Sequence, residues 1–175
     1  IKKYYHDKFG ITLDDALFND WIFTEGLPDN CPIPRSDRFE NVDAYLTHWR
    51  KGERLDRANT KDWSTHEWPH FLKNLPDTLT TTEMKELDTF GRFTVSGNSE
   101  ITTQWLVTAV RHKYAPAYAK LEEFLINTGR RKFLVPLYNE LIKTPEGRQR
   151  AIEIYHKARP NYHFVATNTF DKTIK

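Results

Sequence analysis

The feature that most restricts the fold of this chain is the helical spacing of its apolar residues. Met84, Leu87 and Phe90 follow one another at intervals of three, which places their side chains on one face of an α-helix. Strand-like alternation of apolar and polar residues is weak along the chain. Only the C-terminal residues, which include Val165 and Thr167, have a pattern that would also suit an extended segment. We therefore expect an all-α fold.

Start and stop signals indicate that the helices are short. Thr80 and Glu83 have the spacing of a capping box, and Thr144 followed by Pro145 is typical of a helix start. Gly129 is a typical helix end. We expect about eight or nine short helices, antiparallel to their neighbours because the connections are short. Stacked pairs would form a two-layer, armadillo- or HEAT-like α-solenoid, although no fixed repeat of roughly 30–45 residues is visible.

The composition argues against two classes of partner. The chain has 26 Lys and Arg against 24 Asp and Glu, and so lacks the basic excess of a typical nucleic-acid binder. It has no apolar run of roughly 18 residues, so we expect no membrane-spanning helix.

Cys31 is the only cysteine, which excludes an internal disulfide and a cysteine-based zinc site. We expect a cytoplasmic protein, with a periplasmic location as the open alternative.

We interpret residues 1–175 as a single helical domain, because this length suits one compact unit. The chain begins with Ile1 rather than Met, and the residues that follow already have a helical pattern. We therefore expect the domain to be a fragment of a longer, multi-domain chain, with any targeting segment upstream.

The segment HEWPH at residues 66–70 matches H-E-x-x-H, the zinc-binding helix of many metallopeptidases. That motif needs both histidines on one face of a regular helix. Pro69 lies inside the motif, lacks an amide hydrogen and disfavours helical dihedral angles at the residue before it. Zinc aminopeptidases with this motif have a Glu nineteen residues after the second His, where this chain has Thr89. The pattern is therefore a weak indication of a metal site.

Two interpretations of HEWPH remain. Ser64 and Glu67 have the spacing of a capping box, which would leave His66 and His70 partly exposed at a helix start, without a metal. The alternative is a small zinc peptidase that uses His66, Glu67 and His70. We favour the capping box and predict that this chain has no metal ligands and no catalytic residues of its own.

Three consecutive basic residues, Arg130, Arg131 and Lys132, follow Gly129 at an expected helix start. Positive side chains there oppose the helix dipole, at a cost of roughly a few tenths of a kcal/mol each. Free N–H groups at a helix N-terminus bind anions, and neighbouring Arg and Lys side chains strengthen that binding. The charges alone leave two interpretations open, an anion-binding turn and a solvated basic turn.

Motifs around this turn occur together in one protein family. The chain has an NSE-I…WL turn at residues 98–106, and WIFTEGLP at residues 21–28. It has a GR-x-KF…PL core, formed by Gly129, Arg130, Lys132, Phe133, Pro136 and Leu137. In these motifs the chain resembles the C-terminal helical domain of leukotriene A4 hydrolase and its bacterial zinc aminopeptidase relatives. The resemblance extends over nearly the whole chain, is strong in 96–142 and is loose in 30–62 and 143–160.

The resemblance implies a parent protein with a β domain, a thermolysin-like zinc domain and this helical domain. Zinc and the catalytic residues would belong to the parent's missing catalytic domain, so no cofactor is implied for this chain. The helical domain would pack on that catalytic domain and form one wall of the active-site cleft. In the family an Arg-x-Lys pair holds the carboxylate of a short peptide substrate, and this role falls on Arg130 and Lys132. Arg131 is expected to point to another face.

The main alternative to a domain of a zinc aminopeptidase is a stand-alone α-solenoid that binds a protein partner and has no catalysis. The two hypotheses differ in the sequence expected before Ile1. A zinc-binding H-E-x-x-H motif with a distant Glu would support the peptidase, because the resemblance implies that those ligands lie upstream.

Overall fold

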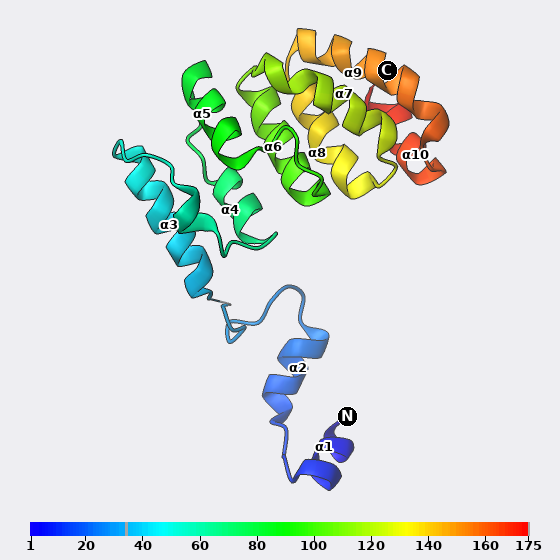
Figure 1. Ribbon diagram of the computed structural model, residues 1–175. Helices are drawn as coiled ribbons and strands as arrows, with labels where there is room; N and C mark the ends of the chain where they lie inside the picture. The colour runs from blue at the N-terminus through cyan, green and yellow to red at the C-terminus, as the bar shows by residue number, and fades with distance from the viewer. Residues whose placement is uncertain (34, 175) are drawn as a thin grey trace. The chain divides into compact units, whose positions relative to one another are not determined.

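The computed structural model describes residues 1–33 and 35–174, and its secondary structure over these residues is helical (Figure 1). The prediction of an all-α fold is confirmed, although the described residues form ten α-helices rather than eight or nine. No helix in this part of the chain is long and apolar enough to cross a membrane. The more specific expectation of an armadillo- or HEAT-like solenoid stays a prediction.

The structure divides into two compact units, Ile1–Ser36 and Asp37–Lys175. The expectation that residues 1–175 form a single helical domain of a longer chain stays a prediction. The smaller unit contains α1 (Lys2–Phe9) and α2 (Asp15–Phe23). Neither helix has a buried residue. Several large apolar side chains of this unit are mostly exposed, among them Phe23 at 76% and Leu27 at 79%. This unit therefore has too little apolar burial to form a core of its own.

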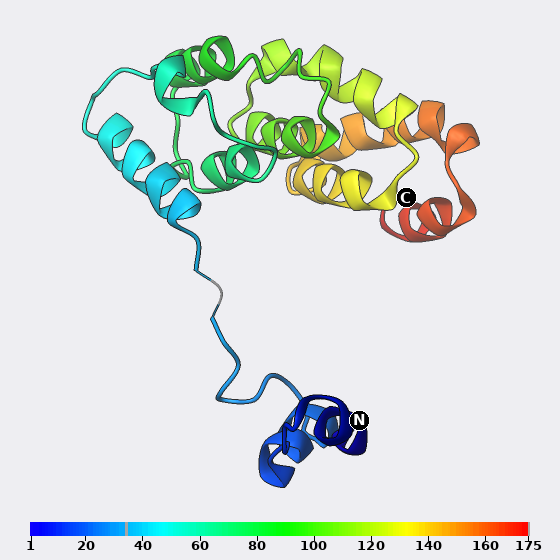
Figure 2. The same ribbon diagram turned by 60° about the horizontal axis from the view of Figure 1, so that its bottom comes forward.

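The larger unit begins with α3 (Asp37–Arg50), α4 (Glu67–Lys73), α5 (Thr81–Gly91) and α6 (Ser99–Arg111). It continues with α7 (Tyr118–Asn127), α8 (Arg131–Leu141), α9 (Pro145–Ala158) and α10 (Phe164–Thr173). Short 3-10 turns occur at η1 (Arg57–Thr60), η2 (Ala115–Ala117) and η3 (Arg159–Asn161). Helices α4, α6 and α8 lie side by side in one layer, and α7 packs beside α9 in another (Figure 2).

The helix starts follow the capping signals of the sequence. Thr80 and Glu83 form the expected capping box, in which the Thr80 N–H donates to Glu83 at 2.7 Å and the Glu83 N–H donates to Thr80 Oγ1 at 3.2 Å. At the start of α9, the Gly147 N–H donates to Thr144 Oγ1 at 3.0 Å. A Cβ at Gly147 would lie 2.1 Å from the carbonyl oxygen of Leu141, so this position requires glycine.

The C-terminal segment is helical throughout α10, so the extended alternative for Val165 and Thr167 is wrong. His163 Nδ1 accepts the Val165 N–H at 3.3 Å and caps the helix. Ala166 and Phe170, four residues apart, are both buried. The burial of these two side chains on one helical face therefore determines the local structure, rather than the weak strand-like alternation of the sequence.

The core of the larger unit is rich in aromatic side chains. Trp105 of α6 is fully buried, and its indole N–H donates to Thr94 Oγ1 at 2.9 Å. Tyr138 of α8 lies 3.1 Å from the Tyr162 hydroxyl, which donates to the carbonyl oxygen of Leu125 at 2.6 Å. Burial raises the pKa of Tyr162 to about 12. These contacts fix α6 and α8 in the core, and α8 begins at the basic turn.

Candidate functional site

The basic turn lies at the N-terminus of α8. Arg130 is the N-cap residue, with an extended backbone (φ −81°, ψ 111°) and no side-chain capping hydrogen bond. The side chains of Arg130, Arg131 and Lys132 are all exposed. The following Phe133 and Leu134 are buried, so the start of α8 is anchored in the core while its charges face solvent.

The three basic side chains have different neighbours. Lys132 Nζ lies 2.5 Å from Glu100 Oε1, in the first turn of α6. Arg131 Nε donates to Thr169 Oγ1 of α10 at 3.1 Å. The Arg130 guanidinium makes no ion pair or hydrogen bond with another described side chain. Arg131 therefore contacts α10, as expected for a side chain on another face.

Arg130 and Lys132 both lie near the Phe133 ring. The Arg130 guanidinium carbon lies 5.8 Å from the centre of this ring, and Lys132 Nζ lies 5.6 Å from it. Both distances allow cation–π attraction, which orders two otherwise exposed side chains. The turn thus presents a guanidinium and an ammonium around one ring, beside the first N–H groups of α8. Such an arrangement suits a carboxylate, because Arg binds it through parallel hydrogen bonds and Lys adds a point charge.

Glu67 of the HEWPH segment is a structural residue. It is buried (2% exposed), and its carboxylate accepts hydrogen bonds from Arg38 Nε, from the Ser64 hydroxyl and from the Ser64 N–H, the last at 3.0 Å. Burial alone would raise the pKa of this carboxyl, but the hydrogen bonds from Ser64 and Arg38 outweigh it and lower the pKa to about 2. The carboxylate thus joins the starts of α3 and α4.

The predicted capping box at Ser64 and Glu67 forms only in part. Glu67 accepts the Ser64 N–H as predicted, but Ser64 Oγ accepts the N–H of His66 at 3.1 Å rather than that of Glu67. The reason is that α4 begins at Glu67 with His66 as its N-cap, which places Pro69 in the first turn.

The two histidines of the segment have separate surroundings. His66 is exposed at the start of α4, whereas His70 Nε2 lies 2.7 Å from Asp43 Oδ1 and its ring stacks on Phe39 at 4.5 Å. Thr89 Oγ1 donates to the carbonyl oxygen of Lys85 within α5. Over residues 1–33 and 35–174 no three His, Cys, Asp or Glu side chains are grouped as metal ligands. The contacts of Glu67 and His70 instead connect α4 to α3.

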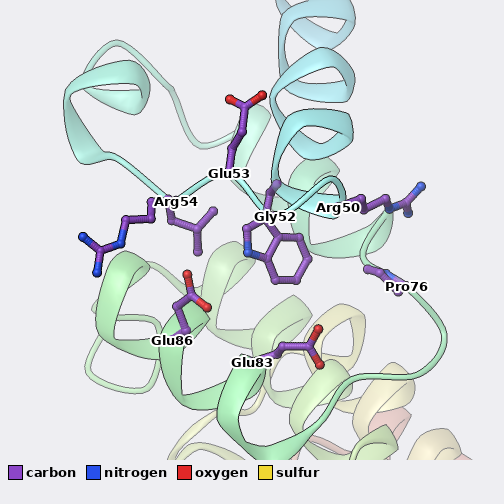
Figure 3. A pocket seen from close by; sticks show the side chains of 9 residues that line it. Arg50, Gly52, Glu53, Arg54, Pro76, Glu83 and Glu86 are labelled. Atoms are coloured by element: carbon purple, nitrogen blue, oxygen red, sulfur yellow. The ribbon is translucent and has the colours of Figure 1, made fainter.

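An open hollow of about 790 Å³ between the end of α3 and α5 is a second candidate site (Figure 3). Trp49 lines it, and charges of both signs surround it. Several of these charges already have partners: Arg50 donates to the carbonyl oxygen of Asn74, Glu53 pairs with His48, and Glu83 belongs to the capping box of α5. The mixed and largely satisfied charges favour no particular ligand, so the turn at α8 is the better candidate.

A smaller hollow of about 410 Å³ at the start of α9 has four basic residues among its lining, Arg111, Lys113, Lys143 and Arg150. Two acidic residues, Glu140 and Glu146, also line it. Glu140 is 9% exposed and pairs with Lys143 at 2.8 Å and with Arg111 at 3.5 Å. Burial raises the pKa of Glu140, but these two cations outweigh it and hold the pKa below its usual range. Arg150 lies over the Tyr118 ring at 4.6 Å. Three of the cations are thus engaged in contacts within the fold.

Comparison with solved structures shows the fold class of this chain, and comparison with protein families shows its family. In fold it is similar to yeast LTA4 hydrolase, in a structure with bestatin, with a TM-score of 0.74 and 19% identity over 99% of this chain and 31% of that one. A second structure, of native yeast LTA4 hydrolase, gives a TM-score of 0.70 with 17% identity over 98% of this chain and 31% of that one. These two likenesses show that the chain has the helical fold of about a third of the yeast protein. Residues 63–174 match the family described as leukotriene A4 hydrolase, C-terminal, and the chain belongs to this family.

The curated relatives are named as aminopeptidases. Leucine aminopeptidase 2 of Kluyveromyces lactis is 27% identical over 92% of this chain and 27% of its own length. Aminopeptidase B of Rattus norvegicus is 22% identical over 86% of this chain and 25% of its own length. The chain therefore spans about a quarter of the length of these relatives. The resemblance stated from the GR-x-KF…PL and NSE-I…WL motifs is confirmed, and both motifs lie within the matched residues.

Proposed function

We propose that this chain is the helical C-terminal domain of a zinc aminopeptidase, in which Arg130 and Lys132 bind the C-terminal carboxylate of a short peptide substrate. The observation that supports this role is the position of both cations beside the Phe133 ring, with the Arg130 guanidinium free of ion pairs among the described residues. A guanidinium without a partner is ready to receive a carboxylate. We call Arg130 and Lys132 the carboxylate clamp.

The proposed partner is the peptidase domain of the same protein, on which this chain would form one wall of the active-site cleft. Two observations support this partner. The matched relatives are about four times longer than the segment they share with this chain. The smaller unit exposes apolar side chains such as Trp21, Phe23 and Leu27, and such patches typically mark a contact with another protein surface. We propose the cytoplasm as the compartment, because the only cysteine, Cys31, is free.

Zinc would belong to the peptidase domain and would supply the hydrolytic chemistry there. The residues of this chain contribute binding and orientation. A tripeptide's terminal carboxylate is remote from the N-terminal bond that an aminopeptidase cleaves, so the clamp uses binding energy to position that bond. The preferred substrates are accordingly dipeptides and tripeptides with a free carboxylate.

The test is a set of three substitutions in the complete aminopeptidase. Arg130→Ala removes a charge-assisted contact that is worth about 2–4 kcal/mol in a partly closed cleft, so kcat/KM for a tripeptide should fall roughly 30- to 1000-fold. Lys132→Ala should cost less, because Lys is a point charge, and Arg130→Lys should restore little. Arg131→Ala is the control and should behave like wild type. Unchanged cleavage by Arg130→Ala, or damage from Arg131→Ala alone, would contradict the proposed clamp.

A further inference from the structure

One acidic residue lies beside the carboxylate clamp and has no role in the proposed function. Glu100 Oε1 is 2.5 Å from Lys132 Nζ, and the two side chains are 41% and 59% exposed. Glu100 is on α6 and Lys132 on α8, two helices that pack side by side. The ion pair therefore joins neighbouring helices and is set by their packing.

The local structure holds Glu100 in place. Asn98 caps α6, and its Oδ1 accepts the Glu100 N–H at 3.0 Å. The Asn98 side-chain amide in turn donates to Thr65 Oγ1, which precedes α4, at 2.9 Å. These hydrogen bonds hold the backbone at Glu100 in place, so its carboxylate stays next to Lys132.

Glu100 changes the charge that a substrate meets at the clamp. Arg130 and Lys132 provide two positive charges, and Glu100 removes one of them. Arg131 turns to α10, where it contacts Thr169. The clamp and Glu100 together have a net charge of +1, which matches a single carboxylate.

We propose that Glu100 is a specificity-determining residue that makes the clamp select peptides with one carboxylate at the C-terminal residue over peptides with two. The proposal rests on the proposed function. A peptide ending in Glu or Asp brings a second carboxylate to the clamp. Lys132 is already paired there, and Glu100 repels the additional negative charge.

The experiment compares wild type with Glu100→Gln on two tripeptides that differ only in ending in Gln or Glu. These side chains are nearly isosteric, so the ratio of their kcat/KM values isolates the second negative charge. Wild type should prefer the Gln-ending peptide. In Glu100→Gln this preference should fall roughly two- to fivefold, mainly through a lower KM for the Glu-ending peptide, as expected for one like-charge contact near the surface.

Glu122→Gln is a matched control. Glu122 pairs with Lys157 between α7 and α9 at 2.7 Å, with exposures of 38% and 61%, close to those of Glu100 and Lys132. Losing this ion pair should leave the substrate preference at the wild-type value. A general effect of removing a surface ion pair would change both variants alike and would overturn the proposal.

A second arm tests whether the charge of Glu100 reaches the substrate. Lys132→Ala removes the cation that pairs with Glu100. Adding Glu100→Gln should then restore roughly two- to fivefold of the lost kcat/KM. No recovery in this double variant, together with an unchanged preference in Glu100→Gln, would refute the role of Glu100. If those results came with a damaging Arg130→Ala, the clamp itself would stand. A harmless Arg130→Ala would instead reject the clamp, and the role of Glu100 with it.

Discussion

Replacing Glu67 by Gln tests the interpretation of HEWPH as a structural segment. Glutamine keeps the size of the side chain but replaces the negative carboxylate with a neutral amide. That carboxylate accepts hydrogen bonds from Arg38 Nε and from the N–H and hydroxyl of Ser64. Lowering the pKa of this carboxyl from 4.5 to about 2 corresponds to at most about 3 kcal/mol. The Arg38 side chain is 59% exposed, so water replaces part of its contact. We expect Glu67→Gln to lower the free energy of unfolding by about 2 kcal/mol near neutral pH.

The effect should depend on pH in a defined direction. Because the folded-state pKa of Glu67 is below its ordinary value, its stabilisation is complete above about pH 4.5 and is lost as the pH falls toward 2. The difference between wild type and Glu67→Gln should therefore be constant from pH 7 to about pH 5 and shrink in more acidic solution. Urea unfolding followed by tryptophan fluorescence measures it, since Trp63 and Trp68 lie close by in sequence.

Glu83→Gln is the control for this experiment. Glu83 belongs to the capping box of α5, where the hydrogen bonds from Thr80 lower its pKa, and no ion pair with an arginine is formed by Glu83 within residues 1–33 and 35–174. Its substitution should cost about 0.5–1 kcal/mol. A Glu67→Gln variant as stable as wild type, or a difference that does not shrink in acid, would refute the structural role of Glu67.

Two further predictions concern metal and packing. The purified chain should contain no stoichiometric zinc after dialysis, and chelator should leave its melting temperature unchanged; one tightly held zinc that disappears in His66→Ala would show the opposite. Gly147→Ala should lower stability by about 2 kcal/mol or more, because the new Cβ would meet the Leu141 carbonyl oxygen, whereas Gly97→Ala, with open space around it, should change stability by less than about 1 kcal/mol. Equal melting temperatures for the two glycine variants would contradict the close approach at Gly147.

The local signals of the sequence predicted the starts of α5 and α9. The contacts at Thr80 and Thr144 join residues that are three apart, so their geometry follows from the sequence alone. The helical period likewise predicted the fold class. It failed to exclude an extended C-terminus, where the spacing of Ala166 and Phe170 was the signal for α10.

The partners of the charged residues could not be predicted in the same way. Glu67 meets Arg38 across 29 residues, and Lys132 meets Glu100 across 32. Such pairs depend on which helices pack together, and helical spacing does not determine that. The NSE-I…WL motif contains Glu100, but neither its spacing nor its charge indicates that Glu100 pairs with the basic turn.

The most direct test of the carboxylate clamp is the effect of amidating the substrate. We would measure kcat/KM of the complete protein, the aminopeptidase proposed above, and of its Arg130→Ala variant on one tripeptide, with a free or an amidated C-terminus. The clamp predicts that amidation slows wild type and that the large difference between the two enzymes nearly disappears on the amide, because Arg130 then has no carboxylate to bind. An Arg130→Ala defect of equal size on both peptides would contradict carboxylate recognition by this turn.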